Sequence, residues 1–194
     1  MKNLLIIFFI GIFLSSAQIE TINVKNKISQ IIENEIKDTL VKINTTDIET
    51  LDKIINSKKE KYKIIYSFSN TCHFSFDAFP DLINYVKEQN GKYALLIVVS
   101  SGYEEIESIT KYFSKIKYYE PIYILDTVKY GNKKNPSPRN ELMISKLCKE
   151  CNNKKMGFSD LFIRGNNDEI IYHSNYDIPW EKIFENIKKF INVR

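Results

Sequence analysis

Short apolar runs alternate with helix-patterned segments along most of this chain of 194 residues. Residues 94–99 are almost wholly apolar, which is typical of a strand covered on both faces, and residues 62–68 predict a second buried strand. Apolar residues at helical spacing lie between the two runs: Phe76, Phe79, Leu82, Ile83 and Val86. They predict a long helix over 72–89. Strands separated by helices require a sheet with a parallel part.

The same alternation continues on both sides of these segments. Helices are expected over 104–115 and 140–150, and strands over 122–125, 158–163 and 169–173. The last two strands are joined by turn residues and form a hairpin, and a final helix follows Pro179. Upstream, residues 40–43 predict a short strand, and Thr46 with Glu49 forms a capping-box pattern before another helix. A polar loop is expected over 129–138.

The first residues have the pattern of a targeting segment that is not part of the folded domain. A basic start and an apolar stretch of about 11 residues, too short to span a bilayer, precede Ser15, Ser16 and Ala17. This pattern predicts a signal peptide over 1–17, followed by a helical preface over 18–39 and one domain over 40–194. An exported chain, periplasmic or secreted, is then able to keep disulfides.

Composition excludes several classes of protein. The 43% hydrophobic and 13% aromatic content is too high for a disordered chain. A formal net charge of +4, with basic and acidic residues interspersed, gives no nucleic-acid surface. After signal cleavage no stable membrane insertion is expected, because the chain has no other uninterrupted apolar run as long as the one at the front.

Three residues carry a resemblance to a known family. Phe68 ends a predicted strand, Cys72 opens the following helix, and Pro80 lies eight residues further on. From Tyr62 onward the expected order is β-α-β-α-β-α-β-β-α. Together these features resemble the thioredoxin-like family over roughly residues 40–194. The resemblance implies an α/β fold, a three-layer α/β/α sandwich with a mixed parallel and antiparallel sheet.

The chain departs from the family's pattern at four positions. Ser75 stands where the second cysteine of the Cys-x-x-Cys motif belongs, and Thr71 replaces the usual tryptophan. Tyr66 replaces the buried acid of classical thioredoxins. Ser159 occupies the place of the cis-proline in the active-site loop, so the peptide bond before it is expected to be trans.

The resemblance implies that Cys72 is the catalytic nucleophile. A helix start favours a thiolate, Ser75 can donate a hydroxyl to that sulfur, and His73 can add positive charge. The predicted function is thiol–disulfide exchange of the monothiol reductase or isomerase type, acting on protein thiols or disulfides without a cofactor. The alternative is a redox-inactive thioredoxin-like binding module. An exported metal chaperone is a third reading.

Cys148 and Cys151 form a second Cys-x-x-Cys pair. Their spacing allows a local disulfide, half of a zinc site, or a redox pair. A full zinc site needs two more ligands, and no second spaced pair supplies them. In the resembled fold the pair lies near the Ser159 loop, so one of the two thiols could resolve a disulfide on Cys72. A local structural disulfide is the favoured interpretation.

Overall fold

A computed structural model describes residues 40–102, 105–131, 135–151 and 155–192. The predicted signal peptide and helical preface lie outside the described residues. The chain divides into a unit of residues 1–40 and a unit of residues 41–194, and the sheet and its helices belong to the second unit. No helix of the described part is long and apolar enough to cross a membrane.

Six strands form one mixed sheet in the order β1-β4-β3-β2-β5-β6. The strands are β1 (Ile43–Thr46), β2 (Tyr62–Phe68), β3 (Tyr93–Val99), β4 (Ile122–Leu125), β5 (Leu161–Arg164) and β6 (Ile170–His173). The first four run parallel, while β5 is antiparallel to β2 and β6 is antiparallel to β5. Every residue of β2 is buried, as expected for a central strand.

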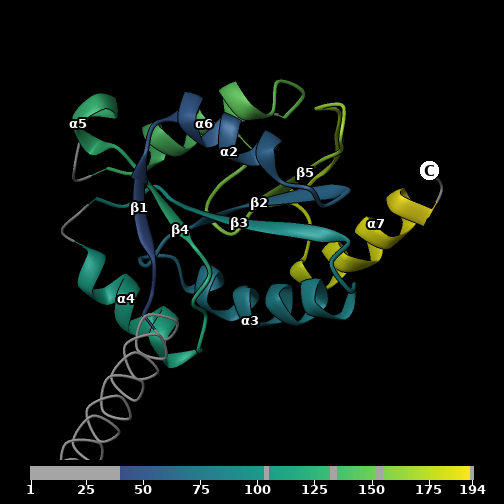
Figure 1. Cartoon of the computed structure of the whole chain (residues 1–194), viewed down its shortest axis with the longest axis horizontal. Coiled ribbons are helices and arrows are strands. Elements are labelled where there is room, and N and C mark those ends of the chain that lie inside the picture. Colours follow the sequence, from purple (N-terminus) through teal and green to yellow (C-terminus); the bar gives the residue numbers. More distant parts are fainter. Residues whose placement is uncertain (1–39, 103–104, 132–134, 152–154, 193–194) are drawn as a thin grey trace, which may run out of the picture. The chain divides into compact units, whose positions relative to one another are not determined.

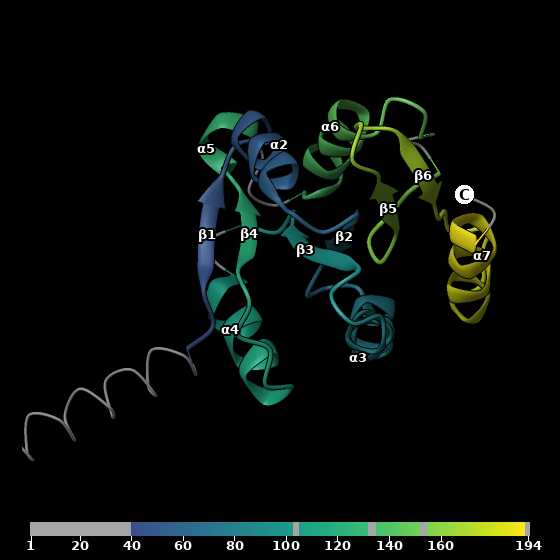
Figure 2. The same ribbon diagram turned by 45° about the vertical axis from the view of Figure 1, so that its right-hand side comes forward.

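Helices cover both faces of this sheet (Figures 1 and 2). One face carries α3 (His73–Glu88), α4 (Ile106–Lys115) and α7 (Trp180–Asn192), and the other carries α2 (Ile48–Ser57) and α6 (Ser137–Leu147). Because side chains alternate along a strand, Ile64 and Tyr66 of β2 join the first core cluster and Ile65 joins the second. The predicted three-layer α/β/α sandwich is therefore confirmed.

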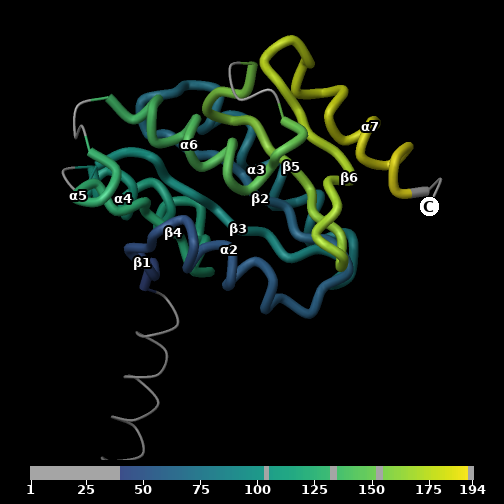
Figure 3. Tube along the Cα trace, turned by 90° about the horizontal axis from the view of Figure 1, so that it is seen from above, coloured from purple at the N-terminus to yellow at the C-terminus, as the bar shows by residue number. Residues whose placement is uncertain are grey.

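The end of the chain completes the antiparallel side of the sheet. Figure 3 shows α7 running beside β6. Ile183, Ile187 and Ile191 are the buried residues of this helix, and Phe184 packs against them from a half-buried position. The helix thus covers the antiparallel strands with the apolar stripe that its sequence predicts.

Several element boundaries differ from the predictions. The first strand begins at Ile43, and the cap of α2 is Asp47, whose carboxylate accepts a hydrogen bond from the Thr50 amide at 2.7 Å. The stretch 129–138 is not wholly loop, because the short helix α5 (Thr127–Tyr130) enters it and α6 starts at Ser137. Two prolines, Pro136 and Pro138, suit the start of α6, where amide donors have no helical partner.

Candidate functional site

Cys72 lies at the point where the chain leaves the central strand and enters α3. It is the N-cap residue of that helix, and its carbonyl accepts the Ser75 amide at 3.0 Å. The side chain is partly exposed, and it is the free cysteine of the described residues. A helix N-terminus presents backbone amides that have no helical partner, although the Cys72 side chain makes no cap hydrogen bond with them.

Ser159 is the residue that contacts this sulfur. Its hydroxyl lies 3.6 Å from Cys72 Sγ and 2.9 Å from the hydroxyl of Ser75. Ser75 is fully buried and also accepts the amide of Ser69 at 3.2 Å. The described residues show no hydrogen bond between Ser75 and the sulfur, so donation by Ser75 stays a prediction, and Ser159 is the hydroxyl that contacts Cys72 Sγ.

The backbone holds the Ser159 loop against β2. The Ser159 amide donates to the Ser67 carbonyl at 2.7 Å, and the Ser67 amide donates to the Asp160 carbonyl at 3.0 Å. Ser159 has φ of +77°, a left-handed conformation that costs a non-glycine residue about 1 kcal/mol or more. No peptide bond of the described chain is cis, so the bond before Ser159 is trans, as expected.

Tyr66 lies behind this hydroxyl cluster. Its phenol donates to the Ser75 carbonyl at 3.4 Å, and its ring stacks on Phe79 with centroids 5.7 Å apart. Burial raises the pKa of Tyr66, so the phenol stays neutral. A neutral donor thus occupies the position at which the family carries an ionisable acid.

Asp160, which no sequence motif marked, follows Ser159 directly. Its carboxylate accepts hydrogen bonds from the Gly157 amide and the Ser174 hydroxyl, both at 2.7 Å. Burial raises the pKa of Asp160 above its ordinary value, and these two hydrogen bonds oppose the change. The carboxylate closes the turn over 157–160. In the sequence, only its position next to Ser159 could have drawn attention to Asp160.

Asn140 of α6 ties three segments of the site together. Its Oδ1 accepts the Ser67 hydroxyl at 2.5 Å and the Ser100 hydroxyl at 3.3 Å, and its Nδ2 donates to the Gly157 carbonyl at 3.3 Å. Its neighbour Arg139, also buried, donates to the Ser100 carbonyl through Nε at 2.9 Å. No sequence pattern pointed to Asn140, because its partners Ser67, Ser100 and Gly157 lie in segments distant in the sequence.

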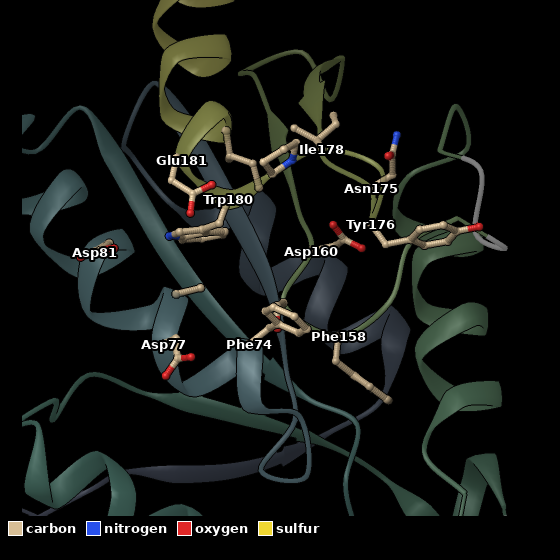
Figure 4. A pocket seen from close by; sticks show the side chains of 14 residues that line it. Phe74, Asp77, Asp81, Phe158, Asp160, Asn175, Tyr176, Ile178, Trp180 and Glu181 are labelled. Atoms are coloured by element: carbon tan, nitrogen blue, oxygen red, sulfur yellow. The ribbon is translucent and has the colours of Figure 1, made fainter.

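A pocket of about 560 Å³ opens beside Ser159. Its walls come from α3, the loop 158–160, the segment 175–179 and the start of α7 (Figure 4). Phe74 of α3 is 72% exposed at its edge, and Trp180 forms part of the opposite wall. Because Ser159 both lines this pocket and touches Cys72, the pocket begins next to the sulfur.

His73 points toward solvent rather than toward Cys72. Its Nε2 lies 2.9 Å from the carboxylate of Asp77, one turn further along α3, and the two side chains are 84% and 63% exposed. An exposed pair of this kind contributes little to stability. The His73 side chain is thus directed at Asp77 and not at the sulfur.

Cys148 and Cys151 form a disulfide with each other, at a Cα–Cα distance of 5.3 Å. Cys148 is the C-cap residue of α6 and is fully buried in the second core cluster, while Cys151 is half-buried against it. The three cysteines therefore divide into one free thiol and one local pair. Among the described residues no group of three or more His, Cys, Asp and Glu side chains could hold a metal ion.

Comparisons with known proteins give structural likenesses. No protein-family model and no curated protein matches the sequence. The exposed lipoprotein thioredoxin Etrx1 of Streptococcus pneumoniae TIGR4 is 12% identical, with a TM-score of 0.46 over 70% of this chain and 89% of that one. Copper-bound ScoI of Arabidopsis thaliana is 11% identical, with a TM-score of 0.45 over 74% and 89% of the two chains. Spinach chloroplast thioredoxin F is 14% identical, with a TM-score of 0.34 over 81% and 93%.

The fold is thioredoxin-like. Its class follows from the strand order, the antiparallel pair β5 and β6, the terminal helix α7, and a cysteine at the start of the helix after the central strand.

Proposed function

We propose that this protein is an exported thioredoxin-like protein that carries out thiol–disulfide exchange through Cys72, acting on protein thiols or disulfides. The observation that supports this proposal is the environment of the Cys72 sulfur. Cys72 lies at the N-terminus of α3, partly exposed, with the Ser159 hydroxyl 3.6 Å away. The helix N-terminus and the hydroxyl both favour a thiolate, which is the attacking species in exchange.

The reaction begins when the Cys72 thiolate attacks one sulfur of a partner disulfide. A bond forms between the two sulfurs, the partner's S–S bond breaks, and the other partner sulfur leaves as a thiolate that takes a proton from water. Cys72 is then held in a mixed disulfide. If a second thiolate of the same partner attacks the partner sulfur of this bond, a new disulfide forms in the partner, Cys72 leaves as a thiolate, and there is no net oxidation or reduction.

Ser75 favours a monothiol mechanism. It occupies the position of a resolving cysteine, and the Cys148–Cys151 pair is already joined in its own disulfide. Reduction of a partner then needs an external low-molecular-weight thiol to attack the mixed disulfide, and two such thiols are oxidised in each cycle. Isomerisation needs no such supply, so it is the activity that the site supports best.

Export is supported by the pattern of residues 1–17 and by the local disulfide. A basic start, a short apolar centre and small residues at the cut are typical of a signal peptide. Disulfides persist in oxidising compartments such as the periplasm or the extracellular space. The N-terminal sequence of the mature protein tests this: it should begin at Gln18, and an intact N-terminus in the exported fraction would contradict cleavage.

Recovery of activity from scrambled ribonuclease tests the exchange reaction. The wild type should restore ribonuclease activity faster than the uncatalysed mixture, and Cys72→Ser should not. Equal and negligible recovery in both would reject exchange.

A second candidate is a redox-inactive binding module. It is favoured by Ser75 in place of a resolving thiol and by the pocket beside Ser159. Titration with iodoacetamide separates the two functions. A Cys72 that reacts only near pH 8.5, as an ordinary thiol does at about its pKa, would favour the binding module.

A further inference from the structure

We propose that the pocket beside Ser159 binds a basic segment of the partner polypeptide, next to the cysteine that meets Cys72. The assignment of a basic ligand rests only on the side chains that line the pocket. Its link to a reacting cysteine rests on the proposed exchange function.

The pocket's position suits a segment that continues from the reacting sulfur. Ser159 lies between Cys72 Sγ and the pocket, and Phe74 lies two residues beyond Cys72 on the rim. A polypeptide chain advances about 3.3 Å for each extended residue, so residues within two or three positions of the partner's cysteine reach this space. The volume of about 560 Å³ accommodates a few side chains rather than a folded element.

Charge is the feature that selects the ligand. Of the described residues that line the pocket, four carry a carboxylate and none is a lysine, arginine or histidine; the four are Asp77, Asp81, Asp160 and Glu181. The chain as a whole carries a net charge of +4, so this concentration of negative charge runs against its composition. Carboxylates on the walls repel an acidic segment and attract a lysine or arginine, which is complementarity of the kind that sets specificity.

The carboxylates line the pocket from α3, the loop 158–160 and α7 (Figure 4). Asp77 and Asp81 are one turn apart on α3, and Glu181 is in the first turn of α7. Neither Asp81 nor Glu181 has an ion pair with another described residue, whereas Asp77 pairs with His73 at the rim. Asp81 and Glu181 are both exposed, so their charges are open to a ligand.

Aromatic side chains complete a site for basic residues. Phe74 and Tyr176 are 72% and 66% exposed at the pocket, and Trp180 lies in its wall. Lysine and arginine carry long apolar stems that pack on such rings, and their charged ends are attracted to the ring faces. Aromatic walls with carboxylates around them thus match a lysine or arginine better than a purely apolar or anionic ligand.

Trp180 supplies a direct readout, because it is the only tryptophan of the chain. The Cys72→Ser variant is titrated with short peptides of identical length in which serine replaces the reactive cysteine, flanked by lysine and arginine, by glutamate, or by glutamine. The basic peptide should change the Trp180 emission and bind at least about 10-fold more tightly than the acidic one, with a difference that shrinks as salt screens the charges.

Matched variants locate the effect. The double substitution Asp81→Asn with Glu181→Gln should reduce the preference to below about 3-fold, since both unpaired carboxylates are then neutral. Glu107→Gln removes an exposed carboxylate on α4 and should leave the preference unchanged. Equal binding of the three peptides, or a preference that survives the double substitution, would overturn the pocket assignment.

The result is independent of thiol chemistry, because the titrated variant lacks the Cys72 thiol. Selective binding by Cys72→Ser together with no exchange by the wild type would support the basic pocket and reject the exchange function. Exchange by the wild type at equal rates with basic and acidic peptides would reject the pocket's role and retain exchange.

Discussion

At the scale of single residues, the site is a cluster of hydroxyls around one sulfur. Ser159 approaches Cys72 Sγ, Ser75 approaches Ser159, and the phenol of Tyr66 donates to the Ser75 carbonyl. All of these groups are neutral, so the described surroundings of the sulfur offer hydroxyls and no buried countercharge.

Replacing Ser159 with alanine tests its contact with the sulfur. Ser159→Ala keeps the Cβ, so the backbone cost of the left-handed conformation is unchanged. Alkylation of Cys72 by iodoacetamide at neutral pH should slow by roughly 3- to 10-fold, the equivalent of about 1 kcal/mol for one hydrogen bond. Ser145→Ala, on the exposed face of α6, is the control. An unchanged alkylation rate in Ser159→Ala would show that the hydroxyl does not act on the sulfur.

The raised pKa of Asp160 predicts how the stability of the fold changes with pH. Burial raises its pKa in the folded state above that in the unfolded chain, so the folded state holds this proton more tightly. Its contribution to stability is therefore complete below the ordinary carboxyl pKa and is lost as pH rises through the raised value. In urea unfolding across this range, Asp160→Asn should lose that decline while Glu107→Gln retains it. A decline of equal size in Asp160→Asn would contradict the assignment.

The sequence predicted part of this residue-level picture. Cys72, Ser75 and Ser159 followed from the resemblance, because each occupies a position that the family pattern marks. The contact between Ser159 and the sulfur did not follow, since it depends on a left-handed backbone at a residue 87 positions away. The contacts of Asn140 could likewise not be predicted from the sequence, because hydrogen bonds between distant segments produce no periodic pattern in it.

At the scale of elements, α6 supports the site from the opposite face of the sheet. Its Asn140 bridges the end of β2, the segment after β3 and the turn that carries Ser159. Through these hydrogen bonds the helix helps to fix the position of the Ser159 loop relative to Cys72, although Asn140 has no contact with the sulfur itself.

Asn140→Ala leaves the Ser67 hydroxyl and the Gly157 carbonyl without this partner. The free energy of unfolding should fall by about 2 kcal/mol, the typical cost of unpaired buried polar groups. Alkylation of Cys72 should also slow, because the Ser159 loop is less firmly placed. Urea unfolding and iodoacetamide kinetics measure the two effects. A variant that loses stability but keeps the wild-type alkylation rate would show that Asn140 stabilises the fold without affecting the reactivity of Cys72.

The cap of α2 predicts a different response to acid. Hydrogen bonding to Thr50, first of all to its backbone amide, and then the Lys129 ammonium lower the pKa of Asp47 from 3.8 to about 2. Its contribution to stability is thus present above the ordinary pKa and is lost as pH falls through about 2. In urea unfolding, the advantage of the wild type over Asp47→Asn should shrink between about pH 5 and pH 2. A constant difference would contradict the lowered pKa.

Most elements were predictable from periodicity, and the ends of several of them were not. Strands β2 and β4 match the predicted ranges to the residue, because apolar runs define buried strands sharply. The start of β5 shifts to Leu161, because the turn closed by Asp160 occupies the residues before it. The first helix is capped by Asp47 rather than Thr46, whose hydroxyl instead donates to the Asp47 carbonyl at 3.1 Å.

At the scale of the whole domain, the cysteines serve two separate purposes. The Cys148–Cys151 disulfide closes a short loop at the end of α6, in the core cluster on the face opposite α3. Cys72 stands at the start of α3 with no second thiol beside it among the described residues. Exchange is therefore expected to proceed with the local disulfide intact.

Breaking the local disulfide tests this separation. Cys151→Ser should lower the free energy of unfolding by about 2 kcal/mol, as expected for a short closed loop. Scrambled-ribonuclease recovery should remain within about 2-fold of the wild type, a rate difference of less than about 0.5 kcal/mol. A loss of recovery as complete as that in Cys72→Ser would show instead that the pair resolves the mixed disulfide.

The most direct test of exchange at Cys72 is the intact mass of the protein after reaction with a peptide bearing an activated disulfide, followed by peptide mapping without reduction. The wild type should gain the mass of one peptide, mapped to Cys72, with the Cys148–Cys151 peptide still joined. Cys72→Ser should gain none. A wild type that takes up no peptide, or takes it up at Cys148 or Cys151, would contradict exchange through Cys72.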